Sequence, residues 1–237
     1  MNSYVVILVE PVTPANIGAV CRAMANFGAS ELRLVNPDCN HLDKEAVRLA
    51  VFAEPLLEQA TVFSGLAEAI ADCHYSVAAT RRQGWCRGEL QTLSDSAESL
   101  ADKSARIGLV FGRERSGLTT DEVVLCSHAA AIETAADGSL NLAQAVVIFL
   151  YEMTRRQQAV PEESTVDLPE QGEFESLFSV MESVLDRTGY INRQKPEALM
   201  NPMRRMVQKG ELSRDELNIL RGVWGRLQES VNDWPGK

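Results

Sequence analysis

The chain has 237 residues, of which 45% are hydrophobic, and its 33 Asp and Glu outnumber its 23 Lys and Arg for a formal net charge of -10. This length fits one large domain, or a medium domain with a small one, and the composition excludes a generally disordered chain because it supplies a packed core. The acidic total argues against a broad basic surface for nucleic acid, while a local basic patch remains compatible with it.

The apolar segments and the cysteines indicate where the protein is located, and the histidines indicate whether it binds a metal. No apolar run approaches the roughly 18 residues that a membrane span needs, and the N-terminus lacks the basic and apolar regions of a secretory signal. The five cysteines are odd in number and scattered, without a C-x-x-C pair, so we expect reduced thiols in the cytoplasm rather than a disulfide framework. The three histidines form no H-x-x-x-H pair, so we expect no zinc site.

Strands and helices alternate over residues 1–157. Apolar runs rich in β-branched residues, such as YVVILV near the start, predict strands at 4–9, 31–35, 75–80, 106–111 and 129–135. Apolar residues at helical spacing predict helices at 16–27, 44–58, 65–72, 119–126 and 140–156. We expect Pro55 to end or kink the second of these helices, because proline breaks the backbone hydrogen-bond ladder.

This alternation predicts an α/β fold: a mainly parallel sheet with helices on both faces. Such sheets bind ligands in the loops beyond the carboxyl ends of their strands. The loops in which to look for a site therefore follow Val9, Ala79, Phe111 and Ala135.

The composition changes near residue 158, and three regions follow from it. Residues 1–158 form the α/β domain, residues 159–175 an acidic linker, and residues 176–237 an all-helical tail. Within the tail we predict helices at 175–187, from Asn201-Pro202 to 209, and after Ser213, which forms a capping box with Glu216. The last helix carries a stripe for another helix, made of Leu217, Leu220, Trp224, Leu227 and Val231.

The first candidate motif, Asn16-x-Gly18-x-x-x-Arg22, follows the first strand. The free N–H groups of a helix N-terminus attract anions, and an arginine fork nearby suits phosphate. Asn16 and Arg22 are six residues apart, so on an ideal helix they lie about 120° from each other. An ordinary helix cap, a packing glycine and a solvated arginine explain the same three residues.

The second motif, Gly112-Arg113-Glu114-Arg115-Ser116-Gly117, follows a strand directly. Its glycines allow a sharp turn and a close approach to a ligand, but the Lys and Ser/Thr of a P-loop are missing after them. A surface turn with a weak ion pair accounts for it as well as a functional loop does.

The third motif, Gly138-Ser139-Leu140-Asn141, lies at a strand-to-helix junction. Ser139 is expected as the helix N-cap, with Asn141 a solvated residue of the first turn. In a functional interpretation, the hydroxyl and the amide contact one ligand.

Together these segments resemble a known family. N-x-G-x-x-x-R, then LVFGRERSGL at 109–118 and SLNLA at 139–143 resemble the SPOUT class of RNA methyltransferases, and within it the SpoU/TrmH branch. The resemblance spans residues 4–157. It extends into the tail, where TGY at 188–190 and ELNILRG at 216–222 resemble tRNA methyltransferases of this branch that act on nucleotide 32 of the anticodon loop.

The resemblance implies a sheet whose C-terminal third is threaded into a trefoil knot, and a homodimer whose active site is completed across the interface. It implies S-adenosylmethionine as cofactor and the ribose 2′-hydroxyl of tRNA as methyl acceptor. Carried over by motif, the catalytic residues are Arg22, Asn16, Glu114, Ser139 and Asn141. The cofactor-binding positions are Ala79, Thr80, Arg81, Gly112, Ile132, Gly138, Ser139 and Leu140.

A 2′-hydroxyl is a poor nucleophile at neutral pH, so alignment and charge stabilisation must supply much of the acceleration. Because a guanidinium stays protonated in proteins, we expect Arg22 to position phosphate and stabilise negative charge rather than to act as a base. A local basic patch that contacts RNA is compatible with the net negative charge of the chain. The candidate residues are the loop and tail arginines Arg82, Arg113, Arg115, Arg204 and Arg205. Ordinary solvated arginines remain the alternative.

Other functions stay open at this point. The same chemistry on ribosomal RNA, or on another tRNA position, fits the motifs equally well. A non-catalytic RNA-binding module would not need the five catalytic positions together, and a nucleotide-binding regulatory protein without RNA is a further alternative.

Overall fold

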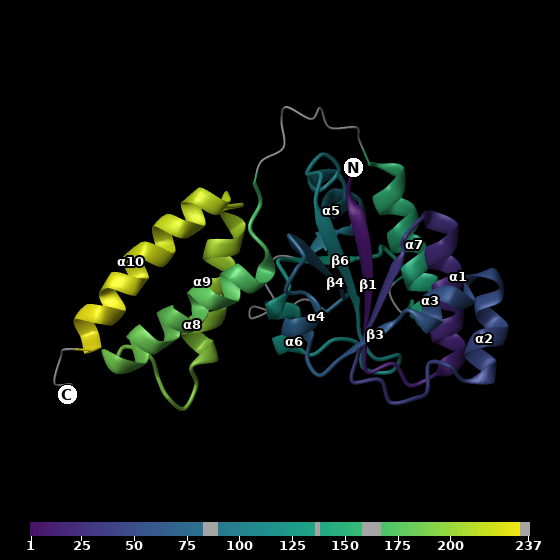
Figure 1. Ribbon diagram of the computed structural model, residues 1–237, viewed down its shortest axis with the longest axis horizontal. Helices are drawn as coiled ribbons and strands as arrows, with labels where there is room; N and C mark the ends of the chain where they lie inside the picture. Colours follow the sequence, from purple (N-terminus) through teal and green to yellow (C-terminus); the bar gives the residue numbers. More distant parts are fainter. Residues whose placement is uncertain (83–89, 136–137, 158–166, 233–237) are drawn as a thin grey trace. The chain divides into compact units, whose positions relative to one another are not determined.

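The computed structural model describes residues 1–82, 90–135, 138–157 and 167–232. The chain divides into two compact units, Met1–Thr165 and Val166–Lys237 (Figure 1). Within the described ranges, no helix combines the length and the apolar character that a membrane span requires.

The first unit is built on a seven-stranded sheet in the order β3-β2-β1-β6-β4-β7-β5, and every strand pair is parallel. The strands are β1 (Ser3–Val9), β2 (Glu31–Val35), β3 (Thr61–Phe63), β4 (Tyr75–Ala79), β5 (Gln91–Thr92), β6 (Arg106–Phe111) and β7 (His128–Ala131). In the middle of the sheet, Val6 lies opposite Leu32 on one side and Leu109 on the other. The predicted parallel α/β fold is confirmed.

Helices cover both faces of this sheet. They are α1 (Pro14–Phe27), α2 (Lys44–Ala50), the 3-10 turn η1 (Val51–Ala53), α3 (Glu54–Glu58), α4 (Leu66–Ala69), α5 (Leu93–Ser99), α6 (Thr120–Leu125) and α7 (Leu142–Arg155). Figure 1 shows α1, α2, α3 and α7 on one side of the sheet and α4 and α6 on the other. The Tyr4 hydroxyl on β1 donates to the Met153 carbonyl on α7 at 3.0 Å. This hydrogen bond connects the central strand to the layer that contains α7.

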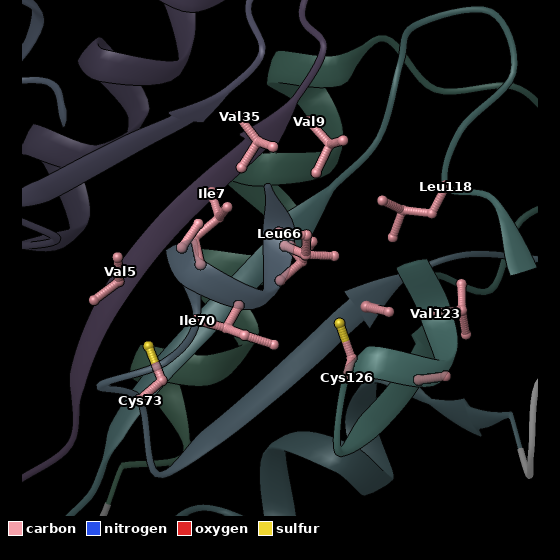
Figure 2. Packing of buried hydrophobic residues seen from close by; sticks show 14 residues of the cluster. Val5, Ile7, Val9, Val35, Leu66, Ile70, Cys73, Leu118, Val123 and Cys126 are labelled. Carbon is pink, nitrogen blue, oxygen red and sulfur yellow. The ribbon is translucent and has the colours of Figure 1, made fainter. Parts of the chain in front are cut away.

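Alternate residues of β1 build the core on the side of α4 and α6. Val5, Ile7 and Val9 gather with Ile70, at the end of α4, in one buried cluster (Figure 2). Leu118, at the end of the loop that follows β6, belongs to the same cluster and is fully buried. The core therefore anchors one end of a loop that carries candidate site residues.

A buried ion-pair network joins the opposite, amino edge of the sheet. Arg33 is only 5% exposed and donates to Glu31 at 2.7 Å and to Asp72 at 2.8 Å, while Arg106 donates to Glu31 at 2.6 Å. The hydrogen bond from Arg33 is the main reason why the pKa of Asp72 lies below its ordinary value. These groups stabilise the sheet at the edge away from the candidate site.

Three sequence expectations for this unit were wrong. The helix predicted over 44–58 breaks at Val51, whose φ is 57°, and not at Pro55, which instead lies in the first turn of α3. The last predicted strand ends at Ala131 rather than at residue 135. Strands β3 and β5 and helix α5 were not predicted, because β3 and β5 are two or three residues long and show no apolar alternation.

The second unit consists of α8 (Gln171–Arg187), α9 (Glu197–Lys209) and α10 (Arg214–Asn232). Their shared core contains Phe174, Leu177, Phe178, Met181, Ile191, Met200 and Leu217. The predicted capping box of α10 is confirmed, with the Ser213 N–H donating to Glu216 at 2.8 Å. Of its predicted apolar stripe, Leu217 and Val231 are buried, Leu220 and Trp224 are partly buried, and Leu227 is exposed.

Two helices of this unit start earlier than predicted. Helix α8 begins at Gln171, inside the range assigned to the linker, because Glu170 and Glu173 form a reciprocal cap there. Helix α9 begins at Glu197, so Pro202 lies inside the helix and does not start it. The proline costs this helix one backbone hydrogen bond.

We predict that Gly18→Ala destabilises the first unit. A Cβ at this position of α1 would lie 2.0 Å from the Ala46 carbonyl oxygen of α2, so the two helices would have to separate. Overpacking of this kind typically costs about 1–3 kcal/mol. Urea unfolding followed by circular dichroism measures the loss.

Gly222→Ala is the matched control, because nothing lies within 4 Å of a Cβ at this position of α10. This change should stabilise its helix by about 0.5–1 kcal/mol, the usual difference between glycine and alanine inside a helix. Equal stability of the Gly18→Ala variant and the wild type would contradict the close helix contact.

Candidate active site

A cavity of about 230 Å³ opens at the carboxyl edge of the sheet. The loops after β4, β6 and β7 and the first turns of α7 line it. All eight residues expected to hold a cofactor are part of its wall: Ala79, Thr80, Arg81, Gly112, Ile132, Gly138, Ser139 and Leu140. Apolar rings form another part of the wall, where Phe111 and Phe149 meet edge to face with ring centroids 5.1 Å apart.

Two glycines close the loop that forms the wall after β6. A Cβ on Gly112 would lie 2.3 Å from the backbone nitrogen of Leu118, so only glycine permits this approach. Gly117 has a φ of 67°, and its N–H donates to the Arg113 carbonyl at 2.8 Å. The loop is therefore a tight structural turn and a cavity wall at once, which resolves the two interpretations left open by the sequence.

Arg113, one of the RNA contacts expected from the sequence, fixes this turn through two carboxylates of its own unit. Its guanidinium donates to Glu10 at 2.7 Å and, through two nitrogens, to Glu122 at 3.0 Å each. The hydrogen bonds that Arg113 donates to Glu10 and then to Glu122 raise the pKa of Arg113 above its ordinary value. One side chain thus joins the end of β1, the cavity loop and the first turn of α6.

Glu114, the next residue, joins the same loop to the start of α1. Its carboxylate accepts the backbone N–H groups of Val12 and Thr13, at 3.2 and 3.1 Å, and the Asn16 amide at 3.1 Å. Partial burial raises the pKa of Glu114, but the hydrogen bonds from Asn16, Val12 and Thr13 outweigh it and leave this pKa below its ordinary value. The carboxylate is therefore ionised and fully engaged at neutral pH.

The hydrogen-bond chain continues from Asn16 to Asn141. The side-chain amide of Asn141 donates to the side-chain oxygen Oδ1 of Asn16 at 2.9 Å. The side-chain oxygen of Asn141 accepts the Ala143 N–H at 2.8 Å. Asn141 is thus the N-cap of α7, and the expected cap Ser139 lies exposed at the cavity wall instead. Glu114, Asn16 and Asn141, from three distant parts of the sequence, form one polar row beside the cavity.

The fifth expected catalytic residue, Arg22, is not brought to this cavity. Its side chain is exposed on α1, lines no part of the wall, and makes no hydrogen bond or ion pair within the described ranges. The separation of six positions between Asn16 and Arg22 carries Arg22 around the helix, as the sequence spacing predicts.

The remaining candidate RNA contacts differ from one another. Arg82 and Arg115 are exposed at the cavity, and Arg81 donates to the Gly138 carbonyl at 2.6 Å, which connects two cavity loops. Arg204 is not a free contact, because it pairs with Glu175 and lies over the Phe178 ring. Arg205 is half-buried on α9, while Arg87 and Asp137 lie outside the described residues.

Sequence reasoning missed the two carboxylates that hold Arg113. Neither Glu10 nor Glu122 is among the site residues expected from the sequence, although both pair with Arg113. No local pattern connects them to Arg113, because Glu10 lies 103 residues away. The signal available was positional, since Glu10 ends β1 and Arg113 follows β6, its neighbour in the sheet.

Two family models match the chain. Residues 3–151 match the SpoU rRNA Methylase family, and residues 172–234 match the C-terminal domain of the tRNA methyltransferase TrmJ. Curated relatives include proteins from Sodalis glossinidius, 36% identical with 97% of this chain and 93% of the relative covered, and Pectobacterium atrosepticum, 35% identical with 98% and 100% covered. Both carry the name tRNA (cytidine/uridine-2′-O-)-methyltransferase TrmJ.

Solved structures agree with these matches. TrmJ from Z. mobilis superimposes with a TM-score of 0.83 at 33% identity, covering 94% of this chain and 98% of that protein. A probable methylase family protein from Haemophilus influenzae has a TM-score of 0.61 at 27% identity, with 97% of both chains covered.

We predict that Arg113→Lys destabilises the first unit by about 1–3 kcal/mol, the usual cost of unpairing partly buried charged hydrogen-bond partners. A lysine has one ammonium group and lacks the fork that reaches Glu10 and Glu122 together. Arg115→Lys is the control, because Arg115 is exposed and makes no described contact. Denaturant unfolding of both variants tests this, and a loss no larger than the control's would refute the clamping role of Arg113.

Proposed function

Because the chain belongs to the SpoU rRNA methylase family and ends in a TrmJ C-terminal domain, we propose that it is a tRNA 2′-O-methyltransferase. Relatives that match along nearly their whole length are named for this activity on cytidine and uridine. The observation that carries the proposal is the polar row of Glu114, Asn16 and Asn141 beside the cavity. In this proposal, the enzyme methylates the ribose of nucleotide 32 in the anticodon loop.

The proposed cofactor is S-adenosylmethionine, and the cavity suits its chemistry. Apolar groups such as Ile132, Leu118 and Phe149 offer contact area to an adenine ring, and the glycine at position 112 lets the backbone approach a ligand closely. Thr80, Arg81 and Ser139 add polar groups at the wall. When bound, the cofactor supplies an electrophilic methyl group on a sulfonium.

The residues of this chain then align the 2′-hydroxyl and stabilise the charge that develops on its oxygen. Asn16 and Asn141 are held in place by Glu114 and by the start of α7, so their amides are fixed before RNA arrives. The lowered pKa of Glu114 makes it a weak base, which assigns it to positioning. Ser139 is exposed at the wall and contributes a hydroxyl that orients the acceptor or the cofactor.

We further propose that the enzyme works as a homodimer in which Arg22 serves the partner's cavity. Arg22 is exposed and remote from its own cavity wall. An apolar patch on the neighbouring helices supports a protein partner, because Tyr151 is 52% exposed and packs edge to face on Phe27, with Val147 one turn before it. A guanidinium from the partner would bind the RNA phosphate and stabilise the ribose oxygen.

Further features of the proposal concern knot and location. We propose that the cavity loops belong to a trefoil knot, as the SPOUT resemblance implies, and that residues between the units act as a linker. A cytoplasmic location is supported by the cysteines of the described residues, Cys21, Cys39, Cys73 and Cys126, all of which are free thiols.

We predict that the purified protein transfers labelled methyl from S-adenosylmethionine to unmodified tRNA, and that nuclease digestion with mass spectrometry finds 2′-O-methyl at nucleotide 32. Arg22→Lys should lower kcat by about tenfold or more, because a lysine lacks the planar fork, with the cofactor Kd unchanged. Arg48→Lys, another exposed arginine, is the control. Methylation of ribosomal RNA alone would replace the tRNA assignment, and near-normal kcat in Arg22→Lys would refute the role of its fork.

Mixed dimers test the shared site. We predict that Arg22→Ala and Gly112→Val proteins are each inactive, the first because it lacks the guanidinium and the second because its side chain collides with the backbone of Gly117 and Leu118 and deforms the wall of its own cavity. After co-expression or subunit exchange, each mixed dimer contains one complete site if Arg22 acts across the interface, so activity should return to about half per heterodimer. No recovery in verified heterodimers would mean that each Arg22 serves its own subunit.

A further inference from the structure

The backbone of the loop between α8 and α9 holds an aromatic side chain in solvent. Gly189 has a φ of 72°, and the N–H groups of Tyr190 and Ile191 both donate to the Leu185 carbonyl, at 2.9 and 3.2 Å. Ile191 enters the helical core and is 6% exposed, whereas Tyr190 beside it is 73% exposed. Because the backbone is fixed on both sides, the outward position of Tyr190 is a consequence of how the helix ends.

Tyr190 is the most exposed aromatic residue in the described part of the chain. Its side chain makes no hydrogen bond or ring contact there, so neither packing nor a hydroxyl partner explains it. An isolated exposed apolar residue needs no explanation, but a rigidly presented aromatic in a charged loop has a specific use.

The charge around Tyr190 indicates which ligand fits. Residues 188–195 contain Arg193 and Lys195 and no acidic residue, in a chain whose formal net charge is -10. Asp186 accepts from Nε and Nη2 of Arg193, at 2.5 and 3.0 Å, which fixes a guanidinium whose side chain stays 76% exposed and whose Nη1 is not used by this pair. The Lys195 side chain is exposed and makes no described contact.

These features favour a nucleotide over an apolar protein surface. The exposed residues that follow Tyr190 along the chain are Asn192, Arg193, Gln194 and Lys195, all polar or cationic. Unpaired bases stack on tyrosine rings, and their phosphates bind cations beside the ring. A protein interface would instead require apolar residues around the aromatic anchor.

We propose that the α8–α9 loop binds an unpaired nucleotide of the tRNA, with the base stacked on Tyr190 and the flanking phosphates at Arg193 and Lys195. This rests on the proposed tRNA substrate and adds a second contact in the helical unit, separate from the cavity residues. The loop raises affinity for the substrate and takes no part in the chemical step.

The test compares full-length Tyr190→Ala and Tyr190→Phe proteins in tRNA binding and methylation at fixed salt. Tyr190→Ala should raise the tRNA Kd and KM about tenfold, the loss of one stacked base, with kcat and the cofactor KM unchanged. Tyr190→Phe should bind like the wild type, because the ring and not the hydroxyl stacks. Arg193→Ala and Lys195→Ala should each make the salt dependence of binding less steep.

Phe52→Ala is the matched control, an aromatic of the first unit that is 61% exposed, and its tRNA affinity should equal that of the wild type. Unchanged binding in Tyr190→Ala would overturn the proposal while the wild type still binds and methylates tRNA. Dissociation of a dimer by Tyr190→Ala, seen by light scattering without RNA, would overturn it in favour of a protein contact. A wild type that neither binds nor methylates tRNA would instead refute the proposed function.

Discussion

The guanidinium of Arg113 lies between the carboxylates of Glu10 and Glu122, and the geometry of the cavity depends on it. From the loop after β6, its guanidinium reaches the end of β1 and the first turn of α6 and holds the three segments at one fixed spacing. A planar fork with several donors satisfies two carboxylates at once, which a point charge cannot do. The cavity wall is therefore set by ion pairing on one side and by the buried Leu118 on the other.

Glu114 continues this arrangement toward the chemistry. Where Arg113 fixes the loop, Glu114 transmits its position to Asn16 and the start of α1, and Asn141 completes the row from α7. Each amide uses one end for structure and the other for its neighbour, so the row is rigid without a ligand. Preorganised dipoles of this kind are what a displacement reaction needs when its nucleophile is weak.

The two units offer different kinds of contact. The sheet unit supplies a concave site with fixed polar groups, whereas the helical unit exposes one aromatic ring among cations. An acidic protein can bind RNA in this way, because only the surface that meets the phosphates needs to be basic. The side chains of Arg113 and Arg204 are only 20% and 16% exposed in their ion pairs, whereas Arg193 keeps 76% of its side chain exposed beside Asp186.

Local physics made much of the molecule predictable from its sequence. The bounds of β2 and β6 follow from short apolar runs, and the capping box at Ser213 from residues three apart, because these features involve neighbours along the chain. The loop motifs that carry the family resemblance are equally local. Only the tertiary structure made Asn141 a helix cap that contacts Asn16 and gave Arg113 the carboxylate of Glu10. Those contacts join residues about a hundred positions apart, and the order of strands in the sheet, which periodicity does not encode, decides which of them meet.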